Sequence, residues 1–150
     1  GFKLKCSIGK SGIKYLKKEG DLATPQGIFN LGLLYYRKDR NKSLKSKIKM
    51  RAIKKNMGWC NDSKSKKYNR QICFPFKYNA EKLYKKDNSY DIFINIKYNH
   101  SPIIKGRGSA IFLHLTNNKY KPTEGCIAIM KKDFLKILPL INRNTKISIS

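Results

Sequence analysis

Alternation of apolar and polar side chains is the main pattern along the chain, and it predicts a protein built largely of β-strands. The clearest example runs over residues 90–98, where apolar residues at 90, 92, 94, 96 and 98 alternate mainly with polar ones. We expect further strands at residues 1–8, with Phe2 on the apolar side, and at 29–35, 109–115, 126–130 and 147–149, with residues 13–16 as a hairpin partner of the first strand.

Helical spacing is confined to two places. Apolar residues between 134 and 141 follow the helical period, and Pro139 is expected to limit or bend that helix. Residues 80–86 predict a second short helix, whereas residues 37–70 are polar and irregular and predict a long loop or insertion with little structure of its own. The chain is therefore expected to be mainly β with one or two short helices, its sheets packed as a sandwich.

The length of 150 residues suits one domain spanning residues 1–150. A chain of this size buries enough surface to fold without a metal or a disulfide. Its hydrophobic content of 40% is too high for a disordered tail. The sequence has no run of 18 apolar residues and no signal-peptide pattern at its N-terminus, so we expect neither a transmembrane segment nor a signal peptide in it.

A net charge of +25 first suggests a nucleic-acid partner. However, 28 of the 34 basic residues are lysines, spread along the chain, and only six are arginines. Because arginine is the residue suited to bidentate recognition of phosphates and bases, we expect no nucleic acid as partner. Weak attraction to another polyanion, such as a cell wall or a membrane surface, fits the charge better.

One pair of residues has the chemistry of a nucleophilic site. His114 ends an apolar strand, and twelve residues later Cys126 follows Gly125 directly and begins another apolar segment. A histidine can take the proton of a neighbouring thiol, and a glycine before the nucleophile permits a tight turn with amides near a developing oxyanion. Residues at this separation can meet across a β-turn-β unit. The alternative is a buried cysteine and a strand-end histidine with no catalytic role.

Several separated motifs add a resemblance to a known family. They are Glu19-Gly20-Asp21-x-x-Thr24-Pro25-x-Gly27, Tyr36-Arg37-x-Asp39-Arg40, Gly58-Trp59-Cys60, Tyr68-Asn69, Gly106-Arg107-Gly108-Ser109-Ala110-Ile111-Phe112-x-His114 and Pro122-Thr123-x-Gly125-Cys126. In this order, and over almost the whole chain, they resemble the YkuD-type L,D-transpeptidase catalytic domain. The resemblance is closest to a branch with Thr-Glu-Gly-Cys in place of Ser-His-Gly-Cys.

The resemblance implies a mainly β domain of packed mixed sheets that acts on bacterial peptidoglycan stem peptides in the periplasm or cell wall, without a metal or organic cofactor. Cys126 would attack an amide carbonyl of a donor stem and form a thioester, which an amine of a second stem would then attack. His114 would act as the base and later as the acid. We expect a monomer.

Two other functions stay open. Water in place of the amine would make the same site a carboxypeptidase or endopeptidase. A basic module that binds anionic polymer or nucleic acid without catalysis is the alternative from another class.

The family motif places a second histidine where this chain has Glu124. We hypothesise that Glu124 holds the amine acceptor, with a solvated loop carboxylate as the alternative. The missing histidine leaves a backbone carbonyl as a candidate to orient His114.

Four further residues are candidates with two interpretations each. Arg107 either clamps a stem-peptide carboxylate or is one more surface cation. Ser109 binds substrate or begins a strand, and Thr123 hydrogen bonds near the nucleophile or shapes its turn. Trp59, the only tryptophan, lines the substrate groove or anchors the long loop.

The spacing of the four cysteines does not fit a metal site. If Cys126 is a free nucleophile, at most one disulfide can form among Cys6, Cys60 and Cys73. Because Cys6, in Cys6-x-x-Gly9, and Cys60 fall in motifs of the resembling branch, they are the tentative pair; reduced cysteines are the alternative.

Overall fold

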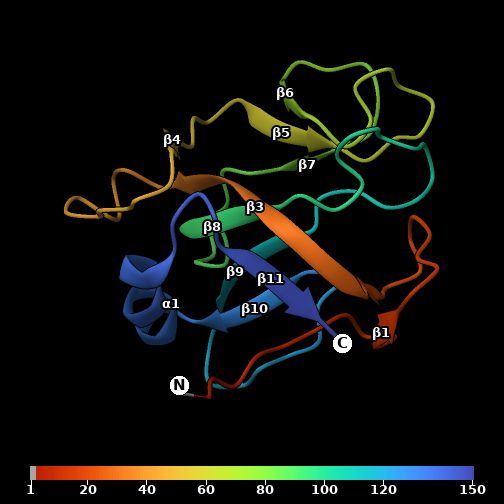
Figure 1. Cartoon of the computed structure of the whole chain (residues 1–150). Coiled ribbons are helices and arrows are strands. Elements are labelled where there is room, and N and C mark those ends of the chain that lie inside the picture. The colour runs from red at the N-terminus through yellow and green to blue at the C-terminus, as the bar shows by residue number, and fades with distance from the viewer. Residues whose placement is uncertain (1–2) are drawn as a thin grey trace.

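A mixed six-stranded sheet runs through the centre of the protein (Figure 1). The computed structural model describes residues 3–150. The strands of this sheet are β3 (Gly27–Tyr36), β4 (Met50–Ala52), β8 (Ile92–Ile96), β9 (Phe112–Thr116), β10 (Ile127–Met130) and β11 (Lys146–Ile149). Their order is β10-β9-β8-β3-β11, and β4 also pairs with β3.

Three smaller elements complete the fold. A three-stranded antiparallel sheet contains β5 (Met57–Cys60), β6 (Gln71–Cys73) and β7 (Ala80–Lys82). A short parallel pair is formed by β1 (Ile13–Lys14) and β2 (Thr24–Pro25). Within the described residues, one helical segment follows β10: α1 (Lys131–Ile137) continues directly into the 3-10 turn η1 (Leu138–Leu140). Figure 1 shows the three-stranded sheet and α1 on opposite sides of the central sheet.

The predicted mainly β fold with mixed sheets is confirmed. Each of the segments 29–35, 90–98, 109–115, 126–130 and 147–149 contains a strand. The predicted C-terminal helix is also present, and its apolar side buries Phe134 and Leu138 completely or nearly so. Pro139 falls in the 3-10 turn that ends the segment, as expected of a residue that interrupts a helix.

Four local predictions are wrong. Residues 80–86 form no helix, because residues 80–82 pair with β5 as an edge strand. Residues 37–70 contain β4 and β5, so this segment has more structure of its own than predicted. Residues 13–16 do not return as a hairpin partner, because β1 pairs in parallel with β2. Residues 3–8 form no strand and contribute only a bridge to β10, while Phe2 lies outside the described residues.

The central sheet is covered on both faces. Alternate side chains of β8 therefore point into two different apolar clusters, and not into the core on one side and solvent on the other. One face joins Ile94, Leu113 and Ile127 to the helical segment in an aliphatic core. The other face carries Phe93 and Phe112 in an aromatic cluster with the three-stranded sheet. The cluster also contains Tyr35, Trp59, Tyr90, Met57, Ile53, Leu83 and Ala110.

Phe112 links the two sheets. Its ring stacks on Phe93 with centroids 4.4 Å apart and receives the edges of Trp59 at 5.1 Å and Tyr90 at 5.7 Å. Aromatic pairs in these geometries contribute beyond their buried area. The fully buried Phe112 ring is therefore one of the contacts that fix the three-stranded sheet over the central sheet, together with Tyr35, which also packs against Trp59.

We expect Phe112→Ala to lower the free energy of unfolding by about 3–5 kcal/mol, because it opens a cavity and removes three ring contacts. Urea denaturation measures the loss. Leu135→Ala is the control, since Leu135 is 43% exposed and should lose roughly 1 kcal/mol or less. Equal losses in the two variants would show that the aromatic cluster does not join the sheets.

Candidate active site

The parallel pairing of β9 and β10 brings the predicted nucleophile and base to one face. Ile127 lies opposite Leu113, and Ala128 lies opposite His114. Side chains alternate along a strand, so Cys126, one residue before Ile127, points to the same face as His114. A β-turn-β unit was expected between the two residues. The structure instead has a crossover over residues 117–126, and the strands run in the same direction.

Both side chains line one cavity of about 770 Å³. Among the other predicted site residues, Ser109, Thr123, Glu124 and Gly125 also line it. Arg107 and Trp59 are not among its lining residues. The structure thus brings together six of the eight residues that the sequence singled out.

His114 is held so that one ring nitrogen faces the backbone. Its Nδ1 atom lies 2.9 Å from the carbonyl oxygen of Leu115. Because a carbonyl only accepts, this contact places the proton on Nδ1 and leaves the Nε2 lone pair to take a proton. The ring packs at 71° to that of Tyr90, 5.3 Å away. Burial lowers the pKa of His114 below its usual 6.5 and so favours the neutral imidazole.

The thiol of Cys126 is also neutral at physiological pH. Its Sγ donates to the carbonyl oxygen of Ala110 at 3.1 Å and accepts from the backbone N–H of Phe112 at 3.4 Å. Burial raises the pKa of the thiol to about 12. A neutral thiol in the same cavity as a neutral imidazole fits a base that removes the proton during attack rather than a preformed thiolate.

The turn before Cys126 requires glycine. Gly125 has φ +143°, and a β-carbon there would lie 2.9 Å from the carbonyl oxygen of Ala23. Thr123 closes the turn: its Oγ1 accepts from the N–H of Gly125 at 3.1 Å and donates to the carbonyl of Cys126 at 2.6 Å. Of the two interpretations of Thr123, these contacts support the one in which it shapes the turn.

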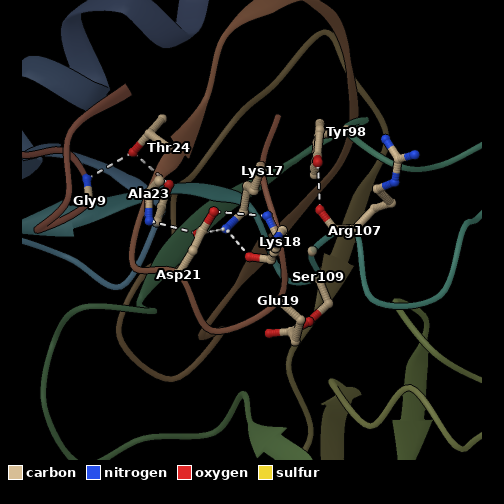
Figure 2. A network of polar contacts seen from close by, with 12 residues as sticks. Gly9, Lys17, Lys18, Glu19, Asp21, Ala23, Thr24, Tyr98, Arg107 and Ser109 are labelled. Atoms are coloured by element: carbon tan, nitrogen blue, oxygen red, sulfur yellow. Dashed lines mark hydrogen bonds and ion pairs between the residues drawn. The ribbon is translucent and has the colours of Figure 1, made fainter. Parts of the chain in front are cut away.

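Thr24 fixes this turn from the opposite side. Its fully buried hydroxyl accepts from the N–H of Gly9 and donates to the carbonyl of Gly125, each at 2.8 Å (Figure 2). Three segments that are distant in sequence therefore meet at one hydroxyl. Thr24 is visible in the sequence only as part of a motif, and the sequence does not predict this contact.

A buried ion pair lies next to Thr24 in Figure 2. Lys17, only 4% exposed, places Nζ 2.8 Å from Oδ1 of Asp21, and that carboxylate also accepts the backbone N–H groups of residues 18 and 23. The lysine stem leaves no room for a side chain at Gly108, and Nζ lies 3.6 Å from where a β-carbon of Gly125 would be. Lys17 therefore packs between the nucleophile turn and the loop before β9.

Glu19 organises that loop. One of its oxygens, Oε1, accepts from the hydroxyls of Ser109 and Tyr68, both at 2.6 Å. The Tyr68 hydroxyl in turn accepts the N–H of Gly108 at 2.9 Å. Burial and the nearby Glu19 raise the pKa of Tyr68, which therefore stays protonated. The Ser109 hydroxyl is thus engaged within the protein, at the cavity wall.

Asn69 connects the aromatic cluster to the thiol. Its Oδ1 accepts the indole N–H of Trp59 at 2.9 Å and the backbone N–H of Ala110 at 3.1 Å. The same residue, Ala110, has φ +54° and accepts the Cys126 thiol. Trp59 is 5% exposed, which supports its role as an anchor and not as a wall of the groove.

Arg107 lies on the surface beside the site. Its side chain is exposed, and its carbonyl accepts the Tyr98 hydroxyl. In Figure 2 its guanidinium extends away from Glu19 and Ser109.

The four cysteines are free thiols, so the tentative disulfide between Cys6 and Cys60 is wrong. Cys6 is exposed, whereas Cys60 is fully buried in β5. Among residues 3–150, no three histidine, cysteine or acidic side chains group closely enough for a metal ion. The same residues contain no helix with the length and apolar character to cross a bilayer.

The cavity differs in charge from the rest of the molecule. It is lined by five of the nine acidic residues of the chain but by only three of its 34 basic ones. The acidic residues are Glu19, Glu81, Asp87, Asp91 and Glu124, and the basic ones are Lys85, Lys121 and Lys131. A chain with a net charge of +25 thus has an acidic site.

Comparison with known families agrees with this architecture. The family model of the L,D-transpeptidase catalytic domain (YkuD) matches residues 2–149, and the chain belongs to this family. No curated protein and no solved structure shows significant similarity to it. Membership supports an enzyme of the L,D-transpeptidase type, with a substrate related to peptidoglycan. Because YkuD domain proteins act on the cell wall, it also points to an extracytoplasmic location.

Thr24→Val should disturb the site, because it keeps the shape of the side chain but leaves a buried N–H and a buried carbonyl unpaired. We expect a loss of about 1–3 kcal/mol in the free energy of unfolding. We also expect slower reaction of Cys126 with an acylating agent. Thr24→Ser, which keeps the hydroxyl, is the matched control and should behave nearly as the wild type. Reaction rates that are equal in both variants would contradict a positioning role for Thr24.

The pH dependence of acylation should follow His114. Only the neutral imidazole accepts a proton, and burial lowers its pKa, so the rate should rise with pH through a midpoint below 6.5 and then stay level. Stopped-flow acylation between pH 4.5 and 9 measures the profile. His114→Ala should lose this midpoint and react about 10²-fold more slowly or worse. A midpoint near 8.5, as for a free thiol, would show that His114 does not serve Cys126.

Proposed function

We propose that the protein transfers acyl groups between peptidoglycan stem peptides through a thioester on Cys126. The observation that carries the proposal is the placement of Cys126 and His114 on the same face of two adjacent parallel strands, inside one cavity. Membership of the L,D-transpeptidase family supplies the substrate class.

In the first step the donor stem occupies the cavity with an amide carbonyl next to Cys126. Nε2 of His114 takes the thiol proton as sulfur attacks the carbonyl carbon. The imidazolium then gives that proton to the departing amine, and the thioester remains. The low pKa of His114 keeps the imidazole unprotonated, as the first transfer requires, and makes the imidazolium a good acid for the second transfer.

In the second step an amine of another stem attacks the thioester carbonyl. The tetrahedral intermediate loses a proton to His114, and the sulfur leaves and takes that proton back. Glu124, exposed at the cavity, is proposed to hold the acceptor amine, and Ser109 to contact the stem at the wall. Arg107 would meet a stem carboxylate only beyond the cavity.

Intact mass spectrometry with a carbapenem tests the first step. We expect the wild type to gain the mass of one carbapenem, since this class of acylating agent traps nucleophilic thiols in enzymes of this type. Cys126→Ala should gain nothing, whereas Cys73→Ala, which removes an exposed thiol outside the cavity, should react as the wild type does. Folded wild-type protein that forms no adduct would overturn the proposal.

Product analysis with purified stem peptides distinguishes transfer from hydrolysis. Cross-linked dimers support the transferase, whereas shortened monomers alone would show that water is the acceptor. Binding of anionic polymer that is unaffected by Cys126→Ala, without any product, would point to a basic module.

A further inference from the structure

Transfer to an amine raises a problem of proton balance, and the inference drawn from it rests on the proposed function. A primary amine is mostly an ammonium ion at neutral pH and must lose one proton before it can attack. It loses a second proton after attack, when the new amide forms. His114 can take only one of the two, and it needs that proton for the departing sulfur. A second proton acceptor in the cavity would let the bound ammonium lose its first proton at the point of attack, and not only in solvent beforehand.

Glu81 is a carboxylate of the cavity wall that the mechanism has not used. It lies on β7, opposite Trp59 of β5, so the three-stranded sheet delivers it to the site. Its side chain is 30% exposed, which leaves an oxygen within reach of a ligand in the cavity. Sequence analysis placed this residue in a helix and gave it no role.

A hydrogen bond fixes the Glu81 carboxylate close to the catalytic histidine. The hydroxyl of Tyr90 donates to Oε1 of Glu81, and the Tyr90 ring packs against the His114 ring at 5.3 Å. Burial raises the pKa of Tyr90 well above 10, so the hydroxyl remains a donor. Glu81, Tyr90 and His114 thus form one contiguous wall of the cavity.

The groups that face Glu81 determine its pKa and therefore its strength as a base. Burial raises its pKa above 4.5, and the charge of Glu124 acts in the same direction, whereas the Tyr90 hydroxyl and Lys85, 3.7 Å away, oppose the rise. A more basic carboxylate is a better proton acceptor.

We propose that Glu81 is a catalytic residue that takes the first proton from the ammonium group of the acyl acceptor, so that His114 is left for the second. The ammonium gives H⁺ to the Glu81 carboxylate and becomes a neutral amine. Its nitrogen forms the bond to the thioester carbon, His114 takes the second proton, and the carbon–sulfur bond breaks. His114 returns that proton to sulfur, and the Glu81 carboxylic acid releases its proton to water.

Glu81 suits this role better than Glu124. Glu124 is exposed, and the protein restrains Glu81 through Tyr90. Glu124 can attract the ammonium, while Glu81 deprotonates it.

The proposal separates three reactions that share one thioester. Acylation involves no acceptor. Attack by water needs only one proton acceptor, because water is neutral, and the same holds for hydroxylamine, which is unprotonated at pH 7.5. Only attack by an ammonium-bearing amine needs Glu81.

Glu81→Gln therefore provides the test, since glutamine still accepts the Tyr90 hydrogen bond but takes no proton. Acyl-enzyme formed from purified stem peptides is followed by mass spectrometry and given stem amine, hydroxylamine or water. We expect transfer to the stem amine at pH 7.5 to fall about 10²-fold, with acylation, hydrolysis and transfer to hydroxylamine nearly unchanged. Asp133→Asn, on α1 and outside the cavity, is the matched control and should leave all four rates unchanged.

A second variant keeps Glu81 and changes its acidity. Tyr90→Phe retains the ring but removes the hydrogen bond that lowers the pKa of Glu81. Because Glu81 must be ionised to act, the pH at which amine transfer is half-maximal should shift upward, relative to that of hydroxylamine transfer.

Three outcomes would overturn the role of Glu81. These are full amine transfer by Glu81→Gln, an equal fall in all its reactions, or no relative pH shift in Tyr90→Phe. Wild-type protein that forms no acyl-enzyme would overturn the proposed function and this inference together.

Discussion

The parallel register of β9 and β10 is the constraint on which the site depends. It sets Ile127 opposite Leu113, and a shift of one residue would turn Cys126 to the opposite face of the sheet. The crossover that permits this pairing has no helix, and the N-terminal segment fixes it. The N–H of Thr123 donates to the carbonyl of residue 8, and its carbonyl accepts from the N–H of residue 10. The N-terminal segment thus helps to hold the crossover, and with it the register of β9 and β10, in place.

The segment between β3 and β8 makes a second set of contacts that support the site. The aromatic face of the central sheet would be open without β5, whose Trp59 packs against Phe112. From the same segment, Asn69 holds the backbone at Ala110, where the thiol donates its hydrogen bond. The segment also contributes an acidic side chain to the cavity through β7. The region between β3 and β8, which includes the predicted polar insertion, is therefore part of the candidate active site.

The sequence alone predicts those features that depend on a local pattern or on the presence of reactive residue types. It predicts the strands, the C-terminal helix and the pair His114 and Cys126, because alternation, helical period and a Gly-Cys step are visible in short windows. It does not predict what depends on long-range pairing. A helix is predicted over residues 80–86, but residues 80–82 pair as a strand, and Trp59 could be a groove wall or an anchor until its neighbours are known. The crossover between β9 and β10 follows a route that the local pattern does not indicate. The Thr24 contact joins two residues that lie 101 positions apart in the sequence.

The hydrogen bonds that Asn69 accepts from Trp59 and Ala110 also limit how this domain can be rearranged. A chain from which residues 37–89 were excised would still contain both reactive side chains, and the ends of β3 and β8 are close enough to be rejoined by a turn, since they pair antiparallel. Such a chain would expose Phe112 to water and free the backbone beneath the sulfur. The site therefore depends on this segment, and grafting the two reactive residues onto a smaller sheet would not transfer the site.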